Sequence, residues 1–296
     1  MNYTYTINDK QYQLIINTFK DTLPLTTPYM KYRAQIKNST ITIYTTNKLL
    51  VQGVDSEETY QNILSLITNS KPTNKINLKD KAIIGTDEVG TGDYFGGITV
   101  CSCFVPLDKQ QLLINLGIKD SKEISDQKIY QLAPILMKTL THEVILLNNE
   151  KYNEITSFPD MNLNKIKAIL HNRVINDILQ KNLNYDEIIV DGFTTKDKYI
   201  DYLKKQEKVC HDVNLIPKAE NTYLAVACAS IIARYHFLEH LKNLSLKFNI
   251  NLPKGARSIV DDVLLNIIET GNEESLNKIA KLNFNNTKKV KAKLKK

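Results

Sequence analysis

Cysteine pairs, long apolar runs and internal repeats are all missing from this sequence of 296 residues. The four cysteines form no CxxC pair and are interpreted as small buried side chains (Cys101, Cys103, Cys210 and Cys228). No stretch approaches the ~18 apolar residues of a membrane span, and the N-terminus lacks the features of a signal peptide. We therefore expect a reduced, cytoplasmic protein with no membrane partner. No fixed-period repeat is visible, which argues against a solenoid.

The charge balance is basic, and the excess is concentrated near one end of the sequence. Lys and Arg number 39 against 32 Asp and Glu, and residues 277–296 contain eight lysines and no acid. Such a cluster attracts polyanions by counterion release, so nucleic acid is a natural partner. A solubilising or disordered tail is equally compatible with this composition.

Residues 1–70 predict a small α+β domain. Residues 3–7 alternate as a strand does, residues 12–19 have apolar side chains at helical spacing, and three β-type runs follow. A second helix is expected from about Asp55, as N-cap, to Thr68. Residues 71–81 are polar and are interpreted as a linker to a second domain, residues 82–296, with a basic C-terminal tail.

The second domain alternates apolar strands with helices. KAIIGTDEV and GITVCSCFV predict two strands joined by a glycine-rich turn, while EVILLN and DEIIVDGF predict two more, separated by a helix near residues 164–181. KVCHDVNLIP predicts a further strand, and an apolar core helix follows from Asn221 onward. Continuous apolar strands are typical of a sheet buried on both faces, so we expect an α/β layered fold.

Carboxylates stand at the ends of these apolar strands. Asp87 and Glu88 end the first strand just before the glycine-rich turn, and Asp191 ends the run EIIV just before Gly192. Adjacent side chains of a strand point to opposite faces, so one of the first two acids must face the interior, where an unpaired carboxylate is costly. Bound metal ions would remove that cost.

A fourth carboxylate, Glu220, stands at the expected start of the core helix, where the helix dipole favours an anion. Four carboxylates would form an all-oxygen site suited to Mg²⁺ or Mn²⁺ rather than zinc. Two such ions ~3.5–4 Å apart could activate a water and stabilise the leaving oxygen of a phosphodiester. The alternative for each acid is an N-capping or solvent-facing role.

The glycine-rich turn GTGDYFGG could bring backbone N–H groups close to a ligand. A 2′-hydroxyl distinguishes RNA from DNA, and the backbone of Gly90, Thr91 and Gly92 could recognise it beside the metals. An ordinary hairpin turn would account for the glycines equally well. The five histidines show no partner pattern and are interpreted as structural or surface residues (His142, His171, His211, His236 and His240).

Segments along the chain resemble, in order, the motifs of bacterial ribonuclease HIII, a type 2 ribonuclease H. GTDEVGTGDYFGG resembles the first catalytic motif, GIKDSKEISD the Asp-Ser-Lys segment, VDGF the third carboxylate and PKAENTYLAVACASIIARY the fourth motif. NLPKGA and KLNFNNTKK resemble C-terminal landmarks of the family. The N-terminal unit is similar to the TATA-binding-protein-like domain that distinguishes type HIII from type HII, so the resemblance covers almost the whole chain.

The resemblance implies a ribonuclease H-like mixed five-stranded sheet flanked by helices, preceded by the small TATA-binding-protein-like domain. It implies an endoribonuclease that hydrolyses the RNA strand of RNA/DNA hybrids, uses Mg²⁺ or Mn²⁺, and leaves 5′-phosphate and 3′-hydroxyl ends. The implied catalytic residues, also the metal ligands, are Asp87, Glu88, Asp191 and Glu220. The implied nucleic-acid contacts are Gly90, Thr91 and Gly92 at the ribose, Ser121 and Lys122 at phosphate, and Lys48 and Gln52 in the first domain.

Three positions depart from common family patterns. Glu220 stands where many relatives have Asp, so its longer arm makes it the weakest of the four ligand assignments. Gly97 stands where Pro is common. Thr91 stands where type HII enzymes have Arg, which supports type HIII and predicts a preference for runs of ribonucleotides over a single ribonucleotide in DNA.

Two other functions use the same residues. The chain could bind nucleic acid without turnover, or it could be a resolvase-like or transposase-like nuclease, which also uses clustered carboxylates. Intact acids at all four positions argue against the first. Lys48 and Gln52 could instead be merely solvated positions in the first domain. No obligate protein partner or dimer interface is evident, so we expect a monomer.

Overall fold

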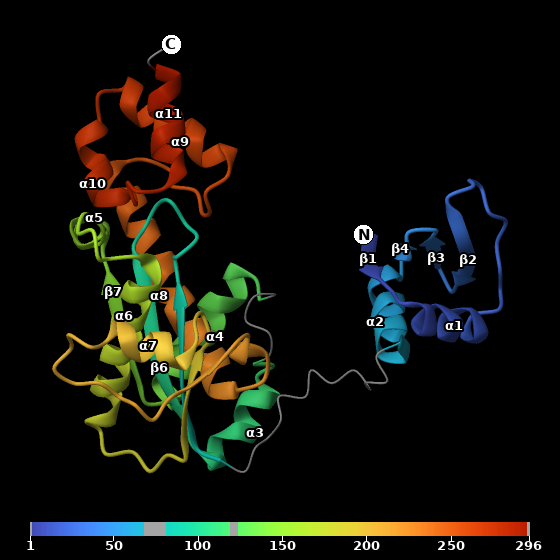
Figure 1. Ribbon diagram of the computed structural model, residues 1–296, viewed down its shortest axis with the longest axis horizontal. Helices are drawn as coiled ribbons and strands as arrows, with labels where there is room; N and C mark the ends of the chain where they lie inside the picture. Colours follow the sequence, from blue (N-terminus) through green and yellow to red (C-terminus); the bar gives the residue numbers. More distant parts are fainter. Residues whose placement is uncertain (1, 68–80, 119–123, 295–296) are drawn as a thin grey trace. The chain divides into compact units, whose positions relative to one another are not determined.

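The computed structural model describes residues 2–67, 81–118 and 124–294 of the chain. It divides into two compact units, residues 1–75 and 76–296 (Figure 1). Of the predicted linker, only Lys81 belongs to the described residues. Within the described ranges, no helix has the length and apolar character needed to cross a membrane.

The first unit is an antiparallel sheet with two helices. Its elements are β1 (Asn2–Thr6), α1 (Asp9–Thr18), β2 (Met30–Ile36), β3 (Ser39–Tyr44), β4 (Lys48–Gly53) and α2 (Ser56–Ile67). The strand order is β1-β4-β3-β2. Helix α1 begins with a capping box, in which Asn8 accepts from the Gln11 N–H while the Gln11 side chain accepts from the Asn8 N–H. The predicted order of strands and helices is confirmed.

The helices of this unit pack on one face of its sheet. Leu49 and Val51 of β4 are fully buried and join Ile15 of α1 and Ile63 of α2 in one apolar cluster. Strand geometry sends the alternate residues of β4 to the opposite face, where Lys48 and Gln52 are exposed.

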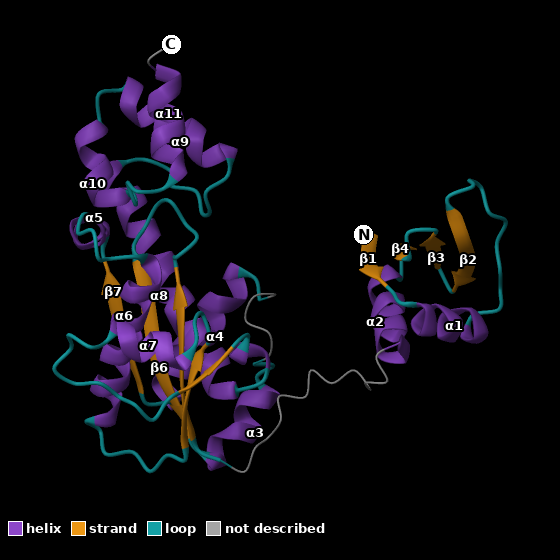
Figure 2. Cartoon of the chain, viewed as in Figure 1, coloured by secondary structure: helices purple, strands orange, loops and turns teal. Residues whose placement is uncertain are grey.

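The second unit contains five strands surrounded by helices (Figure 2). The strands are β5 (Ile83–Val89), β6 (Ile98–Val105), β7 (His142–Leu147), β8 (Glu187–Asp191) and β9 (Asn214–Ile216). The helices are α3 (Leu107–Asn115), α4 (Asp126–Thr139), α5 (Asn149–Thr156), α6 (Leu163–Leu179), α7 (Lys196–Tyr202), the 3-10 turn η1 (Ala219–Asn221), α8 (Leu224–Phe248), α9 (Ser258–Glu269), η2 (Glu273–Ser275), α10 (Leu276–Ile279) and α11 (Asn285–Leu294).

The sheet of the second unit is mixed. Its order is β7-β6-β5-β8-β9, in which β5 pairs antiparallel with β6 and parallel with β8, and β8 pairs parallel with β9. This arrangement confirms the predicted fold class, a ribonuclease H-like five-stranded mixed sheet flanked by helices, preceded by a small α+β domain.

Helices cover both faces of this sheet. Helix α8 packs so closely on β5 that a Cβ at Gly85 would lie 2.3 Å from the Ala225 carbonyl carbon, so only glycine fits there. On the other face, Ile84 of β5 and Val190 of β8 pack with Ile175 of α6. Strand β6 is buried at every position.

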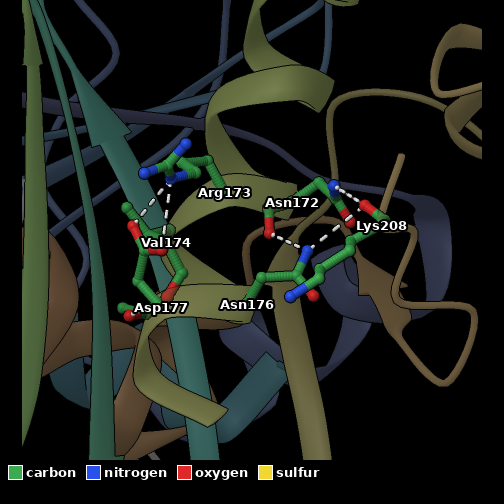
Figure 3. A network of polar contacts seen from close by, with 7 residues as sticks. Asn172, Arg173, Val174, Asn176, Asp177 and Lys208 are labelled. Atoms are coloured by element: carbon green, nitrogen blue, oxygen red, sulfur yellow. Dashed lines mark hydrogen bonds and ion pairs between the residues drawn. The ribbon is translucent and has the colours of Figure 1, made fainter. Parts of the chain in front are cut away.

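The last strand is shorter than predicted. Only residues 214–216 of the expected strand KVCHDVNLIP pair with β8. The preceding segment is held by α6 instead, because Asn172 Nδ2 donates to the Lys208 carbonyl at 2.7 Å and Asn172 Oδ1 accepts from the Cys210 N–H at 3.0 Å (Figure 3). These side-chain contacts replace the ladder bonds that a strand would make.

The C-terminal lysine-rich segment is folded as far as Leu294. Helix α11 packs on α9, with Val290 and Asn286 buried. Asn286 Nδ2 donates to Asp261 of α9 at 2.6 Å. Within the described residues, this part of the chain is therefore a helical cap rather than a free tail.

Candidate metal centre

Asp87 and Asp191 lie at the same edge of the sheet of the second unit. β5 and β8 are parallel neighbours whose pairing ends with Thr86 opposite Val190, so the next residue on each strand, Asp87 on β5 and Asp191 on β8, stands where that pairing ends. Glu220 follows β9, the other neighbour of β8. Three consecutive parallel strand ends thus bring together acids that are far apart in the sequence.

Asp87 and Glu88 point to opposite faces of β5, as strand geometry requires. The Asp87 carboxylate is buried on the α8 side, where it bonds to the Ser230 hydroxyl, and Asp87 Oδ1 also accepts from the Glu88 N–H at 2.7 Å. Glu88 points toward α6. Both residues nevertheless line the same cavity.

Glu88 is held by two residues of α6. His171 Nε2 lies 2.7 Å from Glu88 Oε2, and Lys167 Nζ lies 2.5 Å from Glu88 Oε1. His171 Nδ1 lies 2.7 Å from the hydroxyl of Thr86, so the ring bridges two residues of β5. Phe193 stacks on His171 at 5.4 Å, and Lys167 Nζ lies 4.0 Å from the Phe193 ring centroid. Both oxygens of Glu88 therefore have a cationic or ring-nitrogen partner.

Glu220 is fully buried on η1 rather than at the start of the core helix. Helix α8 begins three residues after the turn, at Leu224, so the expected position at the helix N-terminus was wrong. The carboxylate instead interacts with that of Asp191, whose Oδ1 also accepts from the Ala219 N–H at 3.0 Å. The short turn thus places Glu220 against the third acid.

Burial and neighbouring acids raise the pKa values of Asp87 and Asp191. Burial raises the pKa of Asp87 well above its usual value, and the nearby charges of Glu88 and Asp191 raise it further. Burial, followed by the charge of Glu220, likewise raises the pKa of Asp191. Burial also acts to raise the pKa of Glu88, but the contacts with His171 and Lys167 outweigh it, and the net pKa is lowered. The cluster holds more negative charge than its own surroundings neutralise.

The acids open into a cavity of about 430 Å³ beside the glycine-rich loop. Its lining residues are Asp87, Glu88, Val89, Gly90, Thr91, Gly92, Asp93, Asp191, Ser230 and Arg234. All three predicted ribose contacts therefore lie at the same cavity as three of the four acids. Gly90 has φ +98°, and a Cβ there would lie 2.3 Å from the Gly97 carbonyl oxygen, so the loop needs glycine at this position.

The structure does not place the other predicted contacts relative to this cavity. Ser121 and Lys122 fall outside the described residues, while Lys48 and Gln52 belong to the first unit. Ile124 and Asp126 are held by a residue that lines the cavity: Arg234 donates to the Ile124 carbonyl at 2.8 Å and to Asp126 at 2.6 Å.

Comparisons with known proteins agree with this arrangement. A family model described as Ribonuclease HII matches residues 84–287, and a domain of unknown function (DUF3378) matches residues 2–75. Ribonuclease HIII of Streptococcus gordonii is 38% identical over 98% of this chain and 97% of its own length. Ribonuclease HIII of Streptococcus pneumoniae strain Taiwan19F-14 is also 38% identical, over 98% of both chains. The chain belongs to the ribonuclease HIII family.

Solved structures support the same assignment for the complete fold. The crystal structure of Bst-RNase HIII in complex with Mn²⁺ is 34% identical, with a TM-score of 0.71 over 100% of this chain and 99% of that one. The predicted family resemblance is confirmed, and the protein is a ribonuclease H. This assignment argues against the alternative of a binding protein without turnover.

Sequence reasoning missed Lys167 and His171, the two partners of Glu88 in this ribonuclease HIII fold. Both are buried on α6, although their side chains are polar. A usable signal was present, because residues four apart lie on one face of a helix and this face is otherwise apolar. A buried polar pair on the helix that covers β5 indicates partners on that strand.

Among the described residues of this ribonuclease HIII, no three His, Cys, Asp or Glu side chains already form a metal-binding group. Glu88 is turned toward Lys167 and His171. The donor set nevertheless suits a hard divalent cation, because the surrounding groups are carboxylate oxygens, and burial together with their mutual repulsion raises the pKa values of Asp87 and Asp191.

Proposed function

We propose that this ribonuclease H is an endonuclease that hydrolyses the RNA strand of RNA/DNA hybrids with Mg²⁺ or Mn²⁺. The products would carry 5′-phosphate and 3′-hydroxyl ends. The observation that supports the proposal is the convergence of Asp87, Glu88 and Asp191 on one cavity, next to a glycine-rich loop. The Mn²⁺ complex of Bst-RNase HIII supports Mn²⁺ as one metal to test.

Asp87, Glu88, Asp191 and Glu220 would hold the metal. Asp87 is buried and Asp191 is half-buried, both next to other carboxylates, so a bound cation would offset the cost of their charges. The chemistry that divalent ions supply at such a site is activation of a water and stabilisation of the leaving oxygen of a phosphodiester. Ser230 and the Ala219 N–H fix the orientations of Asp87 and Asp191 by hydrogen bonds.

His171 and Lys167 would orient Glu88. The Thr86 hydroxyl holds the second ring nitrogen of His171, so the imidazole cannot rotate without breaking a buried contact. This arrangement gives Glu88 a fixed direction on β5, where it lines the cavity.

The backbone of Gly90, Thr91 and Gly92 would recognise the ribose. These residues line the cavity beside the acids, and a 2′-hydroxyl is the group that separates RNA from DNA at such a position. In the first unit, Lys48 and Gln52 stand exposed on the sheet face opposite the helices, which suits contact with a nucleic-acid backbone.

A substrate panel tests this function. End-labelled RNA/DNA hybrid, a DNA duplex with one embedded ribonucleotide, plain duplexes and an all-DNA junction are incubated with Mg²⁺ or Mn²⁺. We expect cleavage of the hybrid with 5′-phosphate products, weaker cleavage at the single ribonucleotide, and no cleavage without metal. Cutting of the junction without cutting of the hybrid would favour the resolvase-like alternative and overturn the proposal.

A further inference from the structure

The glycine-rich loop is held from behind by a distant part of the chain. The Gly96 N–H donates to the Ile279 carbonyl at 2.9 Å, the Lys281 N–H donates to the Tyr94 carbonyl at 2.9 Å, and Phe95 forms a β-bridge with Ala280. Residues 279–281 thus pair with residues 94–96 like a short extra strand. The preceding residues of the same loop, 89–93, line the cavity with the acids.

One lysine completes this contact with its side chain. Lys281 is fully buried, and its Nζ donates to the Asp93 carbonyl at 2.6 Å and to the Gly96 carbonyl. Two carbonyls three residues apart therefore converge on one amine. Gly96 has a second donor, because Asn149 Nδ2 lies 2.9 Å from the same oxygen.

The Asp93 end of the loop lies at the cavity. Asp93 is one of its lining residues, and its side chain accepts from the Gly255 N–H at 2.6 Å. Asp93 therefore connects the buried lysine with the cavity, because its carbonyl accepts from Lys281 and the residue itself lines the cavity. A change at Lys281 is transmitted through backbone atoms to Gly90–Asp93, where the ribose would bind.

We propose that Lys281 is a positioning residue for substrate binding: its amine fixes the shape of the loop Gly90–Gly97 and so the placement of the ribose-reading backbone. The inference rests on the proposed function for its effect on cleavage, although the loop contact itself does not. Burying an amine whose N–H donors have no acceptors is unfavourable, and lysine is therefore rarely buried unless its donors are satisfied. Here the carbonyls of the loop satisfy them.

The expected consequence is a change in substrate affinity. If removal of the amine leaves about one loop in ten in the competent shape, the apparent KM rises about tenfold, because affinity falls with the competent fraction. The turnover of bound substrate stays within about twofold, because the acids are not moved. A purely structural role would instead lower the number of folded molecules and reduce Vmax at unchanged KM.

The experiment compares K281M, which keeps the length and removes the donors, with K281R and K278M. Lys278 is exposed in the same segment, so K278M is a matched control for loss of one charge. KM and kcat are measured on an RNA/DNA hybrid with Mn²⁺. Amide hydrogen exchange of residues 90–97 is measured on the full chain without substrate.

We expect K281M to raise KM about tenfold over K278M, and to speed exchange in residues 90–97, with K281R closer to wild type. Unchanged KM and unchanged exchange in K281M would overturn the inference, as would a fall in kcat alone. If wild type cleaves no hybrid, the proposed function fails, while the exchange measurement still decides the role of Lys281.

If K281M does not fold, N149A provides the second variant, since it removes the other donor to the Gly96 carbonyl. The inference then requires that N149A raises KM by less than the tenfold expected for K281M and speeds amide hydrogen exchange around Gly96. Wild-type values of both in folded N149A would overturn it.

Discussion

The two sheets of this protein differ in how many faces helices cover. In the second unit both faces of β5 are packed, so Asp87 contacts Ser230 of α8 while Glu88 contacts His171 of α6. In the first unit, α1 and α2 pack on the face that carries Leu49, and neighbouring Lys48 is exposed on the other. A polar residue in the doubly covered sheet must have a local partner, whereas one on the uncovered face need not.

This difference determines how well each site can be recognised. A carboxylate that follows a buried strand can be recognised in the sequence, because burying its charge without a partner costs free energy. An exposed lysine or glutamine on a sheet surface costs nothing and could equally be solvated. The comparison therefore predicts large effects for changes in the doubly covered sheet and small ones for changes on the uncovered face.

The largest expected effect follows substitution of Asp87. D87N keeps the shape and removes the charge, so turnover of hybrid should fall by at least about a thousandfold, in the range of mutations that remove a core catalytic group. Hybrid binding should remain, because the loop and the first unit are intact. Cleavage and filter binding are measured beside D262N, which changes an exposed acid. Cleavage by D87N at the D262N rate would reject the proposed metal site.

The second effect is on stability, at the contact between β5 and α8. G85A places a Cβ 2.3 Å from backbone of Ala225 and should lower the free energy of unfolding by roughly 1–3 kcal/mol or more, the usual cost of overpacking. G92A is the control, since nothing lies within 4 Å of the added Cβ. Urea unfolding measures both. Equal midpoints for the two variants would mean that the helix and the sheet are not packed this tightly.

The third effect depends on pH and concerns Lys281. Burial lowers its pKa from 10.5 to about 7, partly opposed by Asp93. At pH values between about 7 and 10.5, Lys281 is protonated in the unfolded chain and mostly neutral in the folded chain. The free energy of unfolding of the wild type therefore rises as pH increases from about 7. K281M lacks this contribution. Urea unfolding at pH 7, 8 and 9 should show wild type gaining stability over K281M at each step, and a constant difference would contradict the burial.

The smallest effect belongs to the uncovered face of the first unit. K48A and Q52A should raise KM for hybrid by about two- to fivefold each, the range of single backbone contacts, and change stability by less than about 0.5 kcal/mol. L49A, one position away on the covered face, should cost about 2–5 kcal/mol of stability. A large stability loss in K48A, or none in L49A, would mean that the two faces are assigned the wrong way round.

Most of the fold could be predicted, and so could the convergence of Asp87, Glu88 and Asp191 on one cavity, because apolar strand runs and charged residues that follow them are local patterns. Glu220 was placed on the core helix, since the sequence shows no boundary between the turn η1 and α8. His171 and Lys281 could not be assigned, because their partners lie 83 to 188 residues away in the chain. In the sequence, Lys281 is one of the eight lysines of residues 277–296, and only the contacts with the loop carbonyls explain why it is buried.

The pairing of residues 94–96 with residues 279–281 also has a consequence for folding of the chain during its synthesis on the ribosome. Synthesis proceeds from the N-terminus, so the strands and the acids emerge long before the segment that braces the loop. A nascent chain halted near residue 270 would contain every proposed metal ligand and still lack Lys281. Competence for substrate would thus be acquired late in translation, when the partner segment reaches the loop.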